Sequence, residues 1–174
     1  EFMVCTDTAL GILEERTKKK DKPGTYSGLP FKPLLPLPYK GFRVYPAWGG
    51  GLYLLGKNPG NNHYELYLLF PEQGAKAKKE APLRKLFDID KEITAVAGSG
   101  EKAYVALGNR VVQIEGKKLT PYFTLENETV SDLAFSPKAG LFYATQSSVG
   151  FVSALHKSLS VFMEAPHSRI RIRG

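Results

Sequence analysis

Short apolar runs alternate along the whole chain with turns rich in glycine, asparagine, proline and charged residues. The segment VSDLAFSPKAGLFYATQSSVGFV (130–152) is a clear example, in which the polar turns SPKAG and QSS separate the apolar runs. Short apolar runs bounded by turn residues are typical of β-strands. The segment 9–20 comes nearest to a helical period, but Leu10, Ile12 and Leu13 fit a strand better. We therefore predict an all-β fold.

The same strand–turn–strand pattern recurs along the chain. It occupies the segments 2–13, 51–70, 103–114 and 141–152. Aligned without gaps, the first of these falls on the last, with Leu10 on Val149. The third falls on the last at a constant offset of 38 positions, with Tyr104 on Phe142. In the second, the turn Gly56 to Asn62 is longer and reads as a loop insertion in a similar unit.

Each hairpin is followed by two further short runs. The first kind, often with a proline in it or at its boundary, begins at Phe31, Leu83, Leu119 and Leu159. Because proline lacks an N–H and is tolerated mainly at sheet edges, we predict that these runs form the outer strands. The second kind begins at Phe42, Ile93, Val130 and Ser168. With the strands of one unit named a to d, the chain reads b-c-d, then a-b-c-d three times, then a.

A period of about 38 to 45 residues with four antiparallel strands per unit is typical of a β-propeller. We therefore predict a single all-β propeller domain, or propeller segment, of about four four-stranded antiparallel blades. The expected blades are 1–38 plus 168–174, 42–90, 92–127 and 129–166. A sandwich or a barrel is the alternative for so many short strands, although neither requires a strand-by-strand repeat.

The order of the strands in the repeat predicts where the first sheet obtains its fourth strand. Because the sequence enters at strand b and ends on strand a, the segment SRIRIRG (168–174) is expected to pair beside FMVCTDT (2–8) in a velcro-type closure. Three geometries satisfy this pairing: a four-bladed monomer, an eight-bladed ring of two chains, or one piece of a longer propeller. We favour pairing with a partner outside the single chain.

The segment DLAFSPKAGLFYAT (132–145) resembles the strand–turn–strand of bacterial propellers of the NHL, WD and two-component-regulator types. The resemblance covers about a dozen residues per blade and implies the architecture, with no particular activity. The chain departs from the WD pattern because it contains neither a Gly-His nor a Trp-Asp dipeptide. Propeller lactonases, which share the architecture, hold a metal with acidic and amide side chains of inner strands, where this chain offers Asp132 and Glu92.

Charge and composition narrow the function classes. The net charge of +7 is spread over lysines in apparent turns, which favours solvated loops over a nucleic-acid face. One cysteine, Cys5, allows no internal disulfide, and no histidine pair has metal-ligand spacing. We therefore predict no metal, no cofactor and no catalytic residues. No apolar run of about 18 residues is present, so no membrane span is expected.

Six residues are candidates for binding. Arg169, Arg171 and Arg173 alternate with isoleucines on the last predicted strand, so they form either an anion-binding stripe near the axis or a charged, protected edge. Asp132 lies on a predicted inner strand, while Trp48 and Tyr45 belong to an aromatic-rich unit that suits an interaction surface.

The sequence favours a non-enzymatic propeller scaffold that presents loops to a protein or polymer ligand. The alternatives are a propeller hydrolase or lyase with an axial site, and the sensory propeller region of a larger receptor. A homodimer or another propeller segment is the expected structural partner. The protein is expected to be periplasmic or secreted if a signal segment is removed, and cytoplasmic otherwise.

Overall fold

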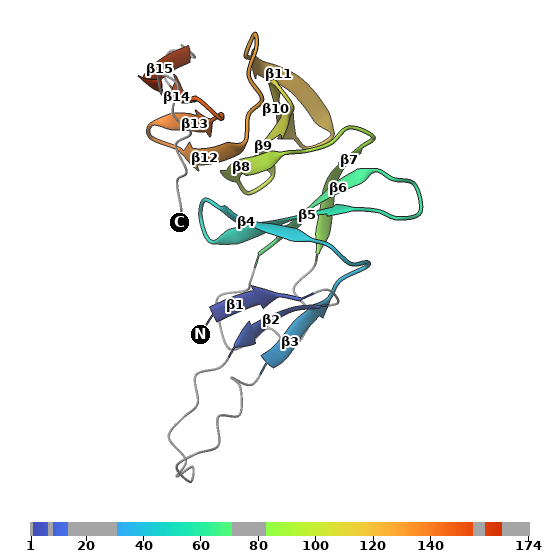
Figure 1. The fold of residues 1–174 in the computed structure, drawn as a ribbon. Coiled ribbons are helices and arrows are strands. Elements are labelled where there is room, and N and C mark those ends of the chain that lie inside the picture. Colours follow the sequence, from blue (N-terminus) through green and yellow to red (C-terminus); the bar gives the residue numbers. More distant parts are fainter. Residues whose placement is uncertain (1, 7–8, 14–30, 71–82, 155–158, 165–174) are drawn as a thin grey trace, which may run out of the picture.

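The computed structural model describes residues 2–6, 9–13, 31–70, 83–154 and 159–164 (Figure 1). These residues form four antiparallel sheets, numbered 1 to 4 in chain order, and in each sheet neighbouring strands are consecutive in sequence. Sheet 1 contains β1 (Phe2–Cys5), β2 (Ala9–Leu13) and β3 (Phe31–Pro36). Sheet 2 contains β4 (Arg43–Ala47), β5 (Gly51–Lys57), β6 (Tyr64–Leu69) and β7 (Arg84–Ile89).

Sheets 3 and 4 have the same strand layout as sheet 2. Sheet 3 contains β8 (Ala95–Ser99), β9 (Lys102–Leu107), β10 (Arg110–Glu115) and β11 (Lys118–Thr124). Sheet 4 contains β12 (Asp132–Ser136), β13 (Gly140–Ala144), β14 (Ser148–Ser153) and β15 (Leu159–Glu164). The all-β class and the four-stranded antiparallel sheets predicted from the sequence are thus confirmed. The predicted last strand, 168–174, lies outside the described residues.

The sheets follow one another in chain order, with sheet 1 and sheet 4 at opposite ends of the array (Figure 1). Apolar cores fill the spaces between consecutive sheets. On β5, Leu54 packs toward sheet 1, whereas Tyr53 and Leu55 pack toward sheet 3. Side chains alternate between the two faces of a strand, so a strand buried on both faces must be apolar almost throughout. This explains the continuous apolar runs of sheets 2 and 3.

A β-bulge occurs at the same place in every sheet. It lies where β2, β6, β10 and β14 pair with the strand that follows them, at Leu10/Gly11, Leu66/Tyr67, Val111/Val112 and Val149/Gly150. A bulge adds one residue to one strand and increases the local twist. The outer strands β3, β7, β11 and β15 therefore diverge from their neighbours in the same way in each sheet.

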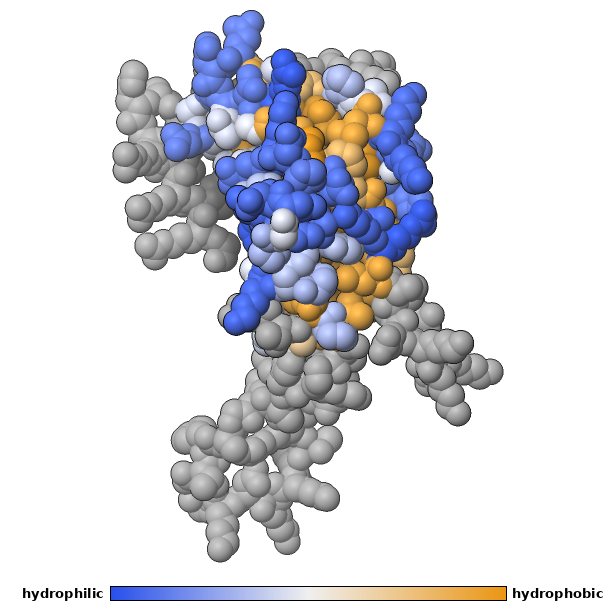
Figure 2. Space-filling model, turned by 90° about the vertical axis from the view of Figure 1, so that its right-hand side faces the viewer, coloured by the Kyte–Doolittle hydropathy of each residue, from blue (hydrophilic) through white to orange (hydrophobic). Residues whose placement is uncertain are grey.

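The outer strands form sheet edges, as their prolines predicted. Pro33 and Pro36 lie in β3, and Pro121 lies in β11 next to the bulge, where it pairs with Val112. Figure 2 looks onto the side of the molecule where β7 and β11 lie, and it shows hydrophilic residues over much of that surface with apolar strips between them. Charged and proline residues on an edge strand discourage pairing with another chain.

Polar contacts lock sheet 2 onto sheet 3. The buried Tyr53 donates its hydroxyl to the carbonyl oxygen of Gly100 at 2.8 Å, across the space between the sheets. Arg84 and Glu101 form an ion pair between the same two sheets. These contacts join β5 and β7 of sheet 2 to the β8–β9 turn of sheet 3.

Replacing Tyr53 with phenylalanine should lower the free energy of unfolding by about 1–2 kcal/mol, because the Gly100 carbonyl loses its buried donor. Tyr143→Phe is the matched control, since the Tyr143 hydroxyl is buried without a hydrogen-bond partner among the described residues. That variant should be neutral or slightly stabilising. Urea denaturation followed by circular dichroism measures the free energy of unfolding of both variants. Equal losses of stability would show that the hydrogen bond from Tyr53 to Gly100 is not what stabilises this contact.

Candidate functional site: a cleft across the inner strands

The first strands of sheets 2, 3 and 4 meet along one side of the molecule. The amide of Trp48 donates to the carbonyl oxygen of Gly98 at 2.8 Å, and the hydroxyl of Ser99 donates to the carbonyl oxygen of Trp48 at 3.1 Å. These bonds join the ends of β4 and β8 in a parallel bridge. At the other interface, the Thr94 hydroxyl donates to the Val130 carbonyl oxygen at 2.8 Å. The strands β4, β8 and β12 are thereby held side by side.

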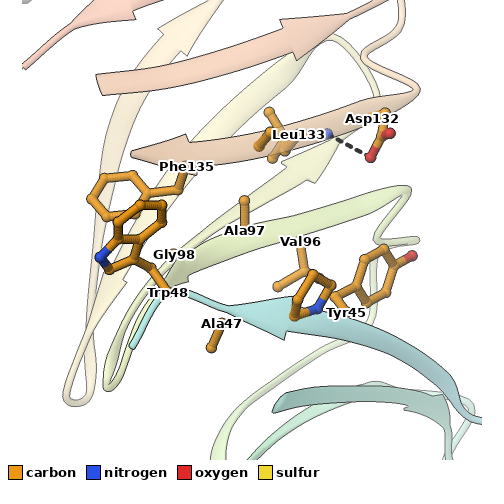
Figure 3. A pocket seen from close by; sticks show the side chains of 11 residues that line it. Tyr45, Ala47, Trp48, Val96, Ala97, Gly98, Asp132, Leu133 and Phe135 are labelled. Carbon is orange, nitrogen blue, oxygen red and sulfur yellow. Dashed lines mark hydrogen bonds between the residues drawn. The ribbon is translucent and has the colours of Figure 1, made fainter. Parts of the chain in front are cut away.

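A cleft of about 530 Å³ lies across these three strands (Figure 3). Its middle is lined by small residues of β4 and β8, among them Ala47, Ala97 and Gly98. Gly98 has a φ of +152°, and a Cβ at this position would lie 2.3 Å from the carbonyl oxygen of Lys102. Only glycine fits between β8 and β9 there, so the backbone conformation at the cleft depends on this residue.

Aromatic rings mark one end of the cleft. Trp48, at the end of β4, is 53% exposed, and Phe135 lies at the same end of the view in Figure 3. A tryptophan side chain this exposed leaves most of a large apolar surface in solvent. This end offers a flat apolar platform to a ligand.

The opposite end carries polar groups. Tyr45 and Asp132 lie there, across Val96 and Ala97 from the indole of Trp48 (Figure 3). Burial, and to a smaller degree the nearby Asp132 carboxylate, raise the pKa of Tyr45 against the opposing effect of Arg43. The phenol therefore stays protonated near neutral pH and can donate a hydrogen bond.

The charge of the cleft opposes that of the whole chain. Among the residues that the structure describes, Asp132 is the one charged side chain that lines it, whereas the chain carries a net charge of +7. One carboxylate oxygen of Asp132 accepts the amide of Leu133 at 2.8 Å, and the residue is exposed to solvent. The guanidinium of Arg43 is directed to the carbonyl oxygen of Ile93, at 2.9 Å. The cleft therefore suits a cationic or hydrogen-bond-donating group at this end.

A second polar cluster surrounds Glu128, in the turn before sheet 4. Its carboxylate accepts the hydroxyl groups of Thr145, Ser147 and Ser148, the last at 2.8 Å. These bonds lower the pKa of Glu128. Because three hydroxyl groups already occupy the carboxylate, the cluster stabilises the β13–β14 turn.

Three of the six sequence candidates lie together, because Tyr45, Trp48 and Asp132 all line the cleft. Arg169, Arg171 and Arg173 lie outside the described residues. Glu92, the second acid considered for an axial metal, does not line the cleft, and the described part of the chain contains no group of three or more residues that could hold a metal ion.

Sequence reasoning missed two contributors, Phe135 and Gly98. The signal for Phe135 was its position three residues after Asp132 on a predicted inner strand, the same spacing that separates Tyr45 from Trp48. The signal for Gly98 was a glycine inside an otherwise apolar strand, which often marks a close backbone approach.

No family model matches this chain, and the comparison with curated proteins finds no match either. Among the described residues, no helix has the length and hydropathy needed to cross a membrane.

Proposed function

We propose that this protein is a β-propeller module, or a segment of one, that binds an extended polypeptide in the cleft across its inner strands. The observation that carries the proposal is the cleft itself, with an exposed indole at one end and a carboxylate at the other. The propeller architecture is supported by the bulge shared by all four sheets and by the apolar cores between consecutive sheets. The convergence of the first strands of three sheets also fits blades arranged around an axis.

The dimensions of the cleft define the ligand. Tyr45 and Trp48 are three residues apart on one strand, as are Asp132 and Phe135 on another, so the polar and aromatic ends are about 10 Å apart. An extended peptide covers this distance in three residues. We expect an apolar or aromatic side chain against Trp48 and a basic side chain beside Asp132. The acidic cleft on a basic protein favours such a cationic segment.

Trp48 provides a direct test, because it is the only tryptophan in the chain. A peptide-display library should yield sequences with an apolar and a basic residue an even number of positions apart, because such side chains lie on the same face of an extended peptide. Binding of a selected peptide should shift the emission maximum of Trp48 to shorter wavelength. Fluorescence titration then gives the dissociation constant.

Removing the aromatic side chain of Trp48 should weaken peptide binding. We expect Trp48→Ala to weaken the selected peptide at least about tenfold, since exposed aromatic anchors carry a large share of interface energy. Asp132→Asn should weaken peptides with the basic residue and leave peptides without it unchanged. Binding of these two variants is measured by isothermal titration calorimetry.

The matched control is Phe70→Ala, which removes an aromatic ring that is 48% exposed and does not line the cleft. It should bind like the unmodified protein. Equal affinity of the Trp48→Ala variant, or selection of oligosaccharides in place of peptides on a mixed array, would contradict the proposal.

A further inference from the structure

Sheet 4 has an apolar face that no other described sheet covers. Its opposite face packs on sheet 3 through residues that include Leu141 and Tyr143. Phe142, Ala144 and Val149 line a shallow hollow of about 150 Å³ on sheet 4. Neighbouring side chains on a strand point to opposite faces, so Phe142 and Ala144 belong to the face away from sheet 3.

The aromatic residue of this face has buried counterparts in the preceding sheets. Tyr53 in β5 and Tyr104 in β9 occupy the corresponding position of the second strand, and each packs against the sheet that follows its own. Tyr53 is fully buried and Tyr104 is 4% exposed. Phe142 in β13 is only half-buried, with its ring stacked on Phe151 at 5.8 Å. The position is therefore built to be covered by a further sheet.

The other two residues of this face, Ala144 and Val149, also have buried counterparts in sheet 3. Ala144 and Val149 correspond to Ala106 and Val111 at the offset of 38 positions. Ala106 and Val111 are fully buried between sheets 3 and 4. This face of sheet 4 thus carries the same kinds of side chain that sheet 3 uses to bind sheet 4.

The complementary set occurs in the sequence of sheet 1. Sheet 4 covers sheet 3 with a face that contains Leu141, Tyr143 and Val152. In the gap-free alignment that places Leu10 on Val149, these positions correspond to Phe2, Val4 and Leu13. All three are apolar. Sheet 1 lies at the opposite end of the array from sheet 4, so the described parts of these two sheets do not contact each other within one chain (Figure 1).

We propose that two copies of this chain pair through these faces, so that sheet 4 of each copy covers sheet 1 of the other. A two-fold axis makes both contacts at once and leaves neither end of the array uncovered. The resulting ring contains eight sheets, within the range of about 4 to 8 blades known for propellers. This inference rests on the proposed propeller architecture and is independent of the ligand in the cleft.

Light scattering on the purified chain tests the pairing. We expect twice the chain mass of 19.2 kDa for the unmodified protein and a single chain mass for Ala144→Arg, because the arginine would lie in the hollow on sheet 4. Phe142→Arg is the second variant on the same face. The control is Leu119→Arg, which places the same charge on an apolar residue of β11 that is 38% exposed, and it should retain the double mass.

The outcomes are distinct from those of the peptide test. A single chain mass for the unmodified protein overturns the pairing, as does a double mass that survives both Ala144→Arg and Phe142→Arg. Loss of the double mass in Leu119→Arg as well would show that the effect is not specific to this face and also overturns the inference. Trp48→Ala should keep the double mass, so failure of peptide binding and failure of pairing are separately visible.

Discussion

Replacing Gly98 with alanine is expected to destabilise the protein by about 3–4 kcal/mol, because the added methyl group has no room between β8 and β9. The added Cβ would lie 2.3 Å from the Lys102 carbonyl oxygen and 2.9 Å from the Cα of Ala103, both of them backbone atoms of the paired strand. Backbone atoms cannot move aside like the end of a flexible side chain. The change must therefore force β8 and β9 apart.

The displacement of β8 should also change the cleft, because Gly98 is hydrogen-bonded to Trp48. The carbonyl oxygen of Gly98 accepts the amide of Trp48, so a displacement of β8 also displaces the end of β4. We expect peptide binding to weaken together with stability in the Gly98→Ala variant. Urea denaturation and fluorescence titration measure the two effects on one sample.

Gly108→Ala is the matched control for this prediction. Gly108 also has a positive φ, of +67°, but a Cβ there would meet nothing within 4 Å. The cost should then be the conformational cost alone, about 1 kcal/mol. If both variants lost the same stability, the close approach of β8 and β9 would not be the cause.

The repeat made the hairpins predictable from the sequence, because the segments 2–13 and 103–114 align without gaps on 141–152 and the segment 51–70 has the same pattern with a longer turn. Proline also identified the outer strands, since it leaves a backbone position without a donor. Within the segment 9–20, the only one with a hint of helical period, the described residues Ala9–Leu13 form the strand β2, as their alignment with 148–152 indicated.

The site was predictable only in part, because its geometry depends on contacts between sheets. Tyr45, Trp48 and Asp132 could be chosen for their chemistry and their place on inner strands. That β4 and β12 flank β8, bringing Trp48 and Phe135 to one end of the cleft, follows from packing between sheets that no local pattern encodes. A polar cluster around Glu65 was missed for the same reason.

Glu65 is a carboxylate inside the apolar strand β6 and is only 3% exposed. Lys85 donates to it at 2.7 Å, Tyr67 at 2.6 Å, Tyr39 at 2.9 Å and the amide of Asn58 at 3.1 Å. These donors come from β6, β7, the β5–β6 loop and the segment between β3 and β4. The cluster therefore ties the outer part of the sheet together, and a buried carboxylate is tolerated because its oxygens are saturated with donors.

Stability should consequently fall in acid. Burial alone would raise the pKa of Glu65, but the hydrogen bonds from Lys85, Tyr67, Asn58 and Tyr39 outweigh it and hold the pKa at about 2. In the unfolded chain the same group titrates near 4.5. Between these values the unfolded state binds a proton that the folded state does not, so the free energy of unfolding falls as the pH is lowered from about 5 to 2. The difference in pKa corresponds to about 3 kcal/mol.

Replacing Glu65 with glutamine should cost about 2–3 kcal/mol at pH 7, because a neutral amide replaces the charged acceptor of Lys85. The same substitution should cost little at pH 2, where the native carboxyl is itself becoming protonated. Urea denaturation at pH 7, 4 and 2 measures this convergence. Asp88→Asn is the control, since Asp88 binds the same Lys85 at 2.8 Å with a side chain that is 46% exposed, and it should cost at most about 0.5 kcal/mol. A loss in the Glu65 variant that is equal at all three pH values would show that the shape of the side chain, and not its charge, stabilises sheet 2.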